Sequence, residues 1–179
     1  MGSLTLIIGC MFSGKSSKLI SLYNEKKDSK QILLINYKDD VRYGENMIIT
    51  HTKQKVICHS CLYLKDIIQK SLFLEADIIM IDEAQFFPDL LEFVIKSVES
   101  FHKEVYVAGL DGDYNRNIFG DIVKLIPLAD MIIKLKAKCN CNGCSNDAIF
   151  SKRIVKNDDK ILIGGIDSYV PVCRKHYLI

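Results

Sequence analysis

Short, unbroken apolar runs alternate with amphipathic stretches along most of the chain. Each run is typical of a strand that is buried on both faces of a parallel sheet. The runs lie at residues 4–8, 32–35, 78–81 and 105–110. Apolar residues recur at helical spacing over residues 15–28, 62–74 and 90–101. Strands separated by helices predict an α/β fold, in which a parallel sheet is flanked by helices.

The pattern changes after about residue 138. The remaining segment has no long helical pattern and holds four of the seven cysteines, with short β-like runs at 149–155 and 161–163. We therefore predict two parts, an α/β nucleotide-binding domain over 1–138 and a small, β-rich module over 139–179.

Composition indicates a folded, globular chain. Of its 179 residues, 49% are hydrophobic and 26% are charged, and the net charge is +2. Basic residues are scattered rather than massed, so the charge pattern gives no support for a nucleic-acid partner. No apolar run approaches the ~20 residues of a transmembrane helix, and residues 1–8 lack the features of a secretory signal. We expect a cytoplasmic protein without a membrane partner.

A phosphate-binding loop follows the first predicted strand. Residues 9–16 fit the pattern Gly-x-x-x-x-Gly-Lys-Ser and lie between a buried strand and a helix, where backbone N–H groups and the helix dipole favour phosphate. Lys15 would neutralise the β/γ-phosphate oxygens, and Ser16 offers a hydroxyl to Mg²⁺. The alternative is a chance glycine-rich turn. The residues expected to contact the nucleotide are Gly9, Cys10, Met11, Phe12, Ser13, Gly14, Lys15 and Ser16.

A second acidic element follows the buried run at 78–81. It begins with Asp82 and Glu83, which matches a Walker B arrangement. A buried strand delivers its last residue to the carboxyl edge of the sheet, where ligands bind in such folds. Asp82 would hold the magnesium water shell, and Glu83 is the candidate general base. The alternative is a solvated turn before Pro88.

The C-terminal cysteines have metal-ligand spacing. Cys141-x-x-Cys144 is followed, after 28 residues, by Cys173-x-x-His176, which predicts a closed tetrahedral Zn²⁺ site with a structural role. Cys139 could take the place of Cys141. The pair Cys58 and Cys61 also has ligand spacing but no partner pair, so we interpret it as structural.

Segments 10–16, 82–89 and 110–120 together resemble the cellular and poxvirus type of thymidine kinase, and the resemblance covers nearly the whole chain. In that family the phosphate loop usually has proline where this chain has Cys10. The resemblance implies that ATP donates its γ-phosphoryl group to the 5′-hydroxyl of thymidine, and of deoxyuridine, with Glu83 and Lys15 as catalytic residues. It also implies that Asp40 joins Ser16 and Asp82 around Mg²⁺.

Further residues enter only through the resemblance. Arg42 would steady phosphate charge, and the spacing to residues 151–153 favours Cys141 over Cys139 as the zinc ligand. A metal-anchored loop would close over the nucleoside. Tyr114 stands where the family usually has phenylalanine, and for each aromatic residue plain core packing is the alternative. The residues expected to line the nucleoside pocket are Met11, Phe86, Leu110, Tyr114, Phe119, Ser151, Gly164 and Tyr169.

The resemblance also implies a homotetramer and feedback inhibition by dTTP. A second hypothesis is a P-loop ATPase whose zinc ribbon binds nucleic acid. Such a module should carry a basic face, whereas the segment at 163–169 resembles a loop that covers a small ligand, so the sequence favours the kinase.

Overall fold

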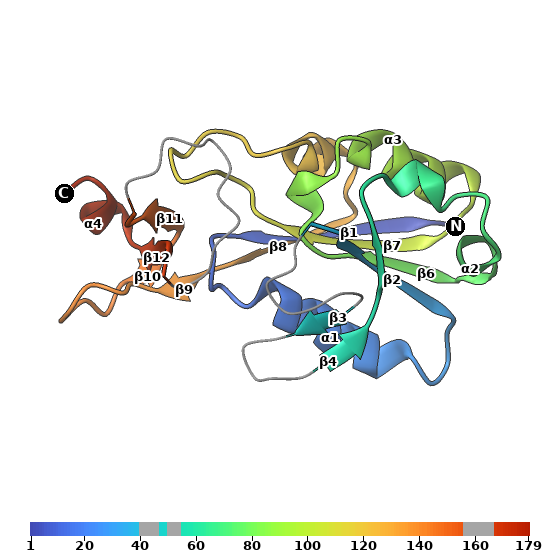
Figure 1. Ribbon diagram of the computed structural model, residues 1–179, viewed down its shortest axis with the longest axis horizontal. Helices are drawn as coiled ribbons and strands as arrows, with labels where there is room; N and C mark the ends of the chain where they lie inside the picture. Colours follow the sequence, from blue (N-terminus) through green and yellow to red (C-terminus); the bar gives the residue numbers. More distant parts are fainter. Residues whose placement is uncertain (40–46, 50–54, 156–166) are drawn as a thin grey trace.

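The computed structural model describes residues 1–39, 47–49, 55–155 and 167–179. A six-stranded parallel sheet forms its centre, in the order β5-β2-β6-β7-β1-β8 (Figure 1). In that order the strands are His59–Cys61, Ile32–Tyr37, Ile78–Ile81, Glu104–Gly109, Ser3–Gly9 and Met131–Leu135. The predicted parallel sheet is confirmed, and each of the four predicted strands is present.

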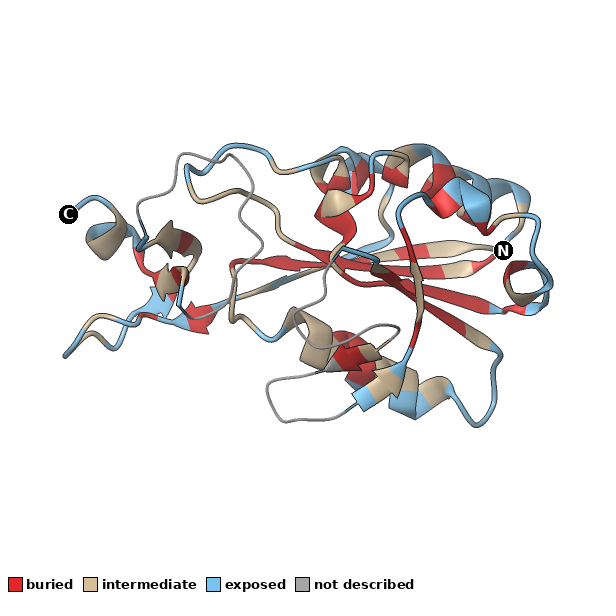
Figure 2. Cartoon of the chain, in the orientation of Figure 1, coloured by how far each residue is buried: buried red, intermediate tan, exposed pale blue. Residues whose placement is uncertain are grey.

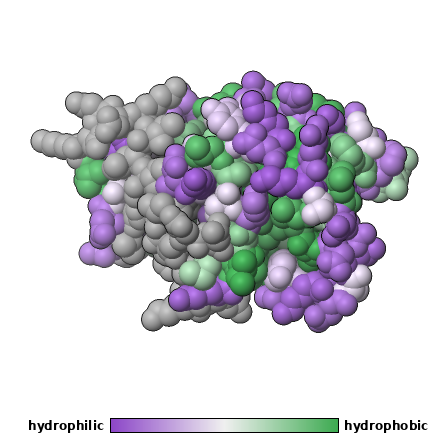
Figure 3. All heavy atoms as spheres, turned by 45° about the vertical axis from the view of Figure 1, so that its right-hand side comes forward, coloured by the Kyte–Doolittle hydropathy of each residue, from purple (hydrophilic) through white to green (hydrophobic). Residues whose placement is uncertain are grey.

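The apolar runs form strands because both faces of the sheet are covered. Alternate residues of β1 enter two different hydrophobic clusters: Leu6 and Ile8 pack in one, and Ile7 packs in the other. All four residues of β6 are buried. Figure 2 shows the buried residues concentrated along these central strands. The face in Figure 3 mixes hydrophilic and hydrophobic side chains, as is usual for the surface of a folded protein.

Helical segments cover the two faces of the sheet. Leu19 and Ile20 of α1 (Lys15–Lys26) pack against one face, and six other helical segments contribute to the cluster on the opposite face (Figure 1). Those segments are η1 (Leu64–Asp66), α2 (Ser71–Glu75), η2 (Ala84–Phe86), α3 (Leu90–Ile95), the π-helical η3 (Lys96–Ser100) and η4 (Ile122–Leu128). None of the helices in the described part of the chain is long and apolar enough to cross a membrane.

The predicted helix over 62–74 is wrong. Only η1 and α2 form there: the carboxylate of Asp89 accepts hydrogen bonds from the backbone N–H groups of Leu64 and Lys65 at the start of η1, at 3.1 and 2.8 Å, and the backbone is interrupted before α2. Lys70 is extended at the start of α2, with ψ of 147°. This break in the helical backbone at Lys70 allows Leu64 and Phe73 to enter the same core cluster from two short segments rather than from one long helix.

The C-terminal part consists of short antiparallel pairs. Its core contains the buried residues Cys10, Ala137, Cys139, Ala148, Val172 and Cys173. Its elements are β9 (Ala137–Lys138), β10 (Asp147–Ala148), β11 (Phe150–Arg153), β12 (Tyr169–Val172) and α4 (Arg174–Tyr177). Separately, β3 (Met47–Ile49) pairs antiparallel with β4 (Lys55–Ile57). β9 pairs with β10, and the division into two domains at residue 138 stays a prediction.

A buried lysine provides a test of the packing around α2. Lys103 is only 7% exposed, and its ammonium donates to the carbonyl oxygens of Leu74 and Ala76 at 3.0 and 2.5 Å. Lys103→Met would remove the donor from both acceptors and leave the Ala76 carbonyl oxygen buried without it, so we expect a loss of about 1–3 kcal/mol in the free energy of unfolding, measured by urea denaturation. Lys30→Met, at an exposed position, is the control, and equal losses in the two variants would contradict this role.

Candidate active site

The phosphate loop and the acidic pair meet at one edge of the sheet. β7 pairs in parallel with β1 on one side and with β6 on the other, so the carboxyl ends of all three strands point the same way. The loop at 9–16 follows β1, and Asp82 and Glu83 follow β6. The carboxyl edge of a parallel sheet is the usual ligand site in α/β folds.

The loop is shaped to enclose an anion. Gly14 precedes α1 with a left-handed φ of 85°, which suits glycine. A Cβ at Gly9 would lie 2.4 Å from the carbonyl oxygen of Leu135 and 2.9 Å from Ser13 Oγ. The hydroxyl of Ser13 is buried and has no hydrogen-bond partner among the described residues. The Ser13 hydroxyl can therefore donate to a phosphate group of a nucleotide bound at the N-terminus of the helix.

Lys15 lies folded back on the loop. Its ammonium donates to the carbonyl oxygen of Cys10 at 2.8 Å. Burial lowers the pKa of Lys15, whereas the nearby carboxylates of Glu83 and Asp82 act in the opposite direction. The loop cation and the acidic pair therefore share one electrostatic environment.

Asp82 carries the most strongly perturbed carboxyl of the site. It is 3% exposed, and burial together with repulsion from Glu83 raises the pKa of Asp82 to about 7. Hydrogen bonds from the Ser16 side chain and from the Glu83 N–H, the latter at 3.0 Å, stabilise its charged form. The Ser16 hydroxyl and the Asp82 carboxylate are the hard oxygen donors that Mg²⁺ prefers. These two residues fit a magnesium ion.

Gln85 holds Glu83 in place. Its side-chain N–H donates to Glu83 Oε2 at 2.6 Å, and its Oε1 accepts the N–H of Leu110 at 2.9 Å. Glu83 itself has a left-handed φ of 50°, which is uncommon outside glycine. The amide therefore links the acidic pair after β6 to the segment after β7. Sequence reasoning did not assign this role to Gln85, although the motif that includes it was recognised.

Aromatic residues line the segments beside the acidic pair. Phe86 stacks on Tyr37 with ring centroids 5.3 Å apart and meets Phe119 edge to face at 5.4 Å. These contacts bring together two of the predicted pocket residues, Phe86 and Phe119. The third ring of the group, Tyr37, was not predicted, because it lies beyond the apolar run at 32–35, although β2 extends to it.

A second group joins the segment at 110–120 to the C-terminal part. The guanidinium of Arg153 lies 3.7 Å from the centroid of the Tyr114 ring, and it donates to the hydroxyl of Tyr169 at 2.8 Å. The hydroxyl of Tyr177 donates to the carbonyl oxygen of Tyr114 at 2.8 Å. Tyr114 and Tyr169 are thus held by one cation, Arg153, which was not predicted as a site residue.

The other predicted site residues do not belong to these two aromatic groups. Met11 donates its backbone N–H to Ser151 Oγ at 2.9 Å, so these two lie together. Leu110 reaches the site through its bond to Gln85. Asp40, Arg42 and Gly164 lie outside the described residues.

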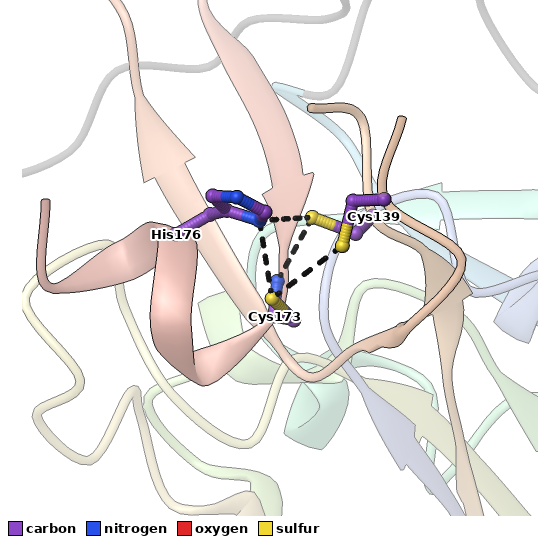
Figure 4. A group of neighbouring side chains, drawn as sticks. Cys139, Cys173 and His176 are labelled. Atoms are coloured by element: carbon purple, nitrogen blue, oxygen red, sulfur yellow. Dashed lines mark hydrogen bonds between the residues drawn. The ribbon is translucent and has the colours of Figure 1, made fainter. Parts of the chain in front are cut away.

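Three thiols and one imidazole converge in the C-terminal part of the chain (Figure 4). Their potential ligand atoms all lie within 4.8 Å of one another, and the residues are Cys139, Cys144, Cys173 and His176. Cys144 Sγ and Cys173 Sγ are 3.9 Å apart, and His176 Nδ1 lies 3.3 and 3.4 Å from the sulfur atoms of Cys173 and Cys139. With Zn–S bonds of ~2.3 Å and Zn–N bonds of ~2.0 Å, a tetrahedral site has edges of about 3.6–3.8 Å. The group fits Zn²⁺.

The structure places Cys139 in this group, not Cys141, which the sequence reasoning favoured. Cys139 directly follows β9, and its sulfur accepts the backbone N–H of Cys173 at 3.3 Å. Cys141 lies beside the group: its side chain is hydrogen-bonded to Cys139, and its carbonyl oxygen accepts the N–H of Cys144 at 3.0 Å. The antiparallel β9–β10 pair positions Cys139, and the choice between the two cysteines as zinc ligand stays a prediction.

The earlier pair of cysteines does not form a second group of this kind in the described part of the chain. Cys58 packs in one hydrophobic cluster and Cys61 in the cluster on the opposite face of the sheet. Burial raises the pKa of the Cys61 thiol to about 12. Both positions therefore act as small hydrophobic side chains.

Two glycines provide a matched test of the close packing of Gly120 against the backbone of Gln85. A Cβ at Gly120 would lie 2.1 Å from the carbonyl oxygen of Gln85, whereas a Cβ at Gly143 would meet open space; both glycines have a left-handed φ, 63° and 72°. We expect Gly143→Ala to cost about 1 kcal/mol in the free energy of unfolding and Gly120→Ala about 3 kcal/mol or more, both measured by urea denaturation. Equal costs would contradict the close approach at Gly120.

Comparisons with known proteins identify the family. Residues 2–177 match the family described as thymidine kinase. The chain is 41% identical to a thymidine kinase of Oryza sativa subsp. japonica, over 99% of this chain and 66% of the rice protein. It is 41% identical to the thymidine kinase of Sheeppox virus (strain KS-1), over 99% and 98% of the two chains. The cytosolic thymidine kinase of Gallus gallus is 37% identical, over 98% of this chain and 77% of the chicken protein. The chain therefore belongs to the thymidine kinase family.

Proposed function

We propose that this protein transfers the γ-phosphoryl group of ATP to the 5′-hydroxyl of thymidine, and of deoxyuridine, to give the 5′-monophosphate used in DNA precursor synthesis. Family membership supports a kinase acting on thymidine. The observation that carries the proposal is the convergence of Lys15, Asp82 and Glu83 at the carboxyl edge of the sheet, with Glu83 held by Gln85.

The phosphate loop would bind the donor. Backbone N–H groups of the loop and the hydroxyl of Ser13 would contact the phosphates, and the Lys15 ammonium would leave the Cys10 carbonyl to neutralise the γ-phosphoryl oxygens. Ser16 and Asp82 would hold Mg²⁺, with Asp40 as a further expected ligand. When bound, the ion supplies charge neutralisation and orientation of the phosphates.

Glu83 would act as the general base. Gln85 occupies one of its carboxylate oxygens, at 2.6 Å, and so fixes the direction of the other. Glu83 accepts the proton as the 5′-oxygen forms its bond to the γ-phosphorus, and the bond from that phosphorus to the bridging oxygen breaks, which releases ADP. Lys15 stabilises the charge on the transferred group.

The aromatic groups would hold the base and sugar of the nucleoside. Phe86 and Phe119 supply flat, apolar surface beside Glu83, as a neutral pyrimidine requires. Tyr114 and Tyr169, both held by Arg153, would border the same pocket. We propose Met11, Leu110 and Ser151 as further contacts, with Gly164 in the loop that covers the base.

We extend the proposal to zinc, to assembly and to regulation. Cys139, Cys144, Cys173 and His176 would hold one structural Zn²⁺. β8 lies at an edge of the sheet, and its Met131 is 56% exposed, which supports pairing with another copy in a homotetramer. The name of the chicken relative supports a cytosolic location. dTTP, which joins the acceptor's nucleoside to a triphosphate, is the proposed feedback inhibitor.

The direct test is transfer of labelled γ-phosphate from ATP to a panel of nucleosides in the presence of Mg²⁺. The panel holds thymidine, deoxyuridine, deoxycytidine and deoxyadenosine. Labelling confined to thymidine and deoxyuridine supports the proposal. Labelling of none of them, with ATP still bound, overturns it, and ATP hydrolysis stimulated by nucleic acid would then favour the ATPase.

Glu83→Gln tests the general base. We expect kcat to fall by about 10²–10⁴-fold, with the affinity for ATP close to that of the wild type, because the amide keeps the shape of the carboxylate but accepts no proton. Steady-state kinetics and ATP titration measure the two quantities. Glu92→Gln, on the exposed side of α3, is the control. An unchanged kcat in Glu83→Gln would remove this residue from the mechanism.

Two cysteine variants test the metal site. We expect Cys139→Ser to lose the zinc and Cys141→Ser to retain about one zinc per chain, measured by metal analysis of the purified proteins, because Cys139, not Cys141, belongs to the group whose ligand atoms all lie within 4.8 Å of one another. Zinc lost from Cys141→Ser and retained in Cys139→Ser would reverse the assignment.

A further inference from the structure

Two hydrogen bonds join the phosphate loop to the C-terminal part of the chain. The backbone N–H of Met11 donates to Ser151 Oγ at 2.9 Å, and the thiol of Cys10 donates to the carbonyl oxygen of Ala148 at 3.4 Å. Ala148 ends β10 and Ser151 lies in β11, so residues about 140 positions apart in the chain lie side by side. The phosphate loop therefore contacts both β10 and β11 of the small module directly.

The side chain of Cys10 belongs to the core of that module. It is 3% exposed and packs in the same cluster as Ala148, Cys139 and Cys173. Cys139 and Cys173 are also two of the four residues of the proposed zinc site. A residue of the phosphate loop thus shares its packing with the backbone that presents the metal ligands.

The backbone of Cys10 faces the other way, toward the reacting groups. Its carbonyl oxygen accepts the hydrogen bond from the Lys15 ammonium at 2.8 Å. Before a nucleotide binds, this bond holds Lys15 in the loop, so a shift of Cys10 within the small core would change the starting position of the ammonium and of the loop backbone. Cys10 is therefore the link between the core of the module and the cation of the phosphate loop.

We infer that the metal-bound module sets the shape of the phosphate loop, with Cys10 and Ser151 as positioning residues for ATP binding. The small cluster around Ala148 is too limited to fold firmly without a metal to hold its ends. Loss of the metal would release both hydrogen bonds to the loop. The module then acts on the phosphate donor, in addition to its proposed role in covering the nucleoside. This inference rests on the proposed binding of ATP by the loop.

The test measures the Kd for ATP with Mg²⁺, by isothermal titration calorimetry and without nucleoside, in proteins that retain their zinc. We expect Cys10→Ala and Ser151→Ala each to raise the Kd by about 3- to 10-fold, the effect of losing one hydrogen bond. Cys10→Ser and Ser151→Thr keep a donor or an acceptor at the same place and should stay within about 2-fold of the wild type. Zinc content is measured for each variant.

Cys58→Ala is the matched control. Cys58 is buried like Cys10 but packs in a different cluster, so its loss should lower stability without changing the Kd for ATP. Chelation of zinc from the wild type should also raise the Kd. Wild-type protein that binds no ATP would refute the proposed function itself. Wild-type protein that binds ATP, with a Kd unchanged in both alanine variants, would refute only the link from module to loop.

Discussion

The parallel pairing of β1, β7 and β6 is the constraint on which the site depends. Parallel strands bring their carboxyl ends to one edge, so the loop after β1 and the acidic pair after β6 meet although β7 lies between their strands. β7 ends at Gly109, and the N–H of the next residue, Leu110, donates to the Gln85 side chain. The three segments that carry the chemistry are thus positioned by backbone pairing first and by side chains second.

Burial at this edge makes the charged groups depend on one another. Asp82 and Glu83 repel each other, and Lys15, Ser16 and Gln85 offset that repulsion from different directions. The pKa of Asp82 is raised because burial disfavours the charged form of this carboxyl while no cation is bound. A divalent ion would stabilise the two repelling carboxylates, and phosphate charge would stabilise the Lys15 ammonium. Binding of this kind agrees with the kinase activity that the family assignment supports.

The sequence predicted the parts of the fold that depend on local pattern. The buried strands and the phosphate loop follow from runs of neighbouring residues. The α/β fold class follows from the alternation of these strands with helical segments. It did not predict that Gln85 links Glu83 to Leu110 or that Asp89 binds the backbone at Leu64, because each contact depends on a partner distant in the sequence. It offered Cys139 only as an alternative to Cys141, because the contact of Cys139 with Cys173 is also distant in the sequence. β8 was missed because an edge strand with exposed residues has no buried run. The roles of Asp40, Arg42 and Gly164 stay predictions.

The most direct measurement is the position of the acceptor oxygen in a crystal structure with thymidine and an unreactive ATP analogue bound together. We expect the 5′-oxygen to lie within hydrogen-bond distance of the Glu83 carboxylate, about 2.6–3.2 Å, and in line with the γ-phosphorus beside Lys15. A 5′-oxygen remote from Glu83, with another group in contact with it, would contradict the assignment of this edge as the site of transfer.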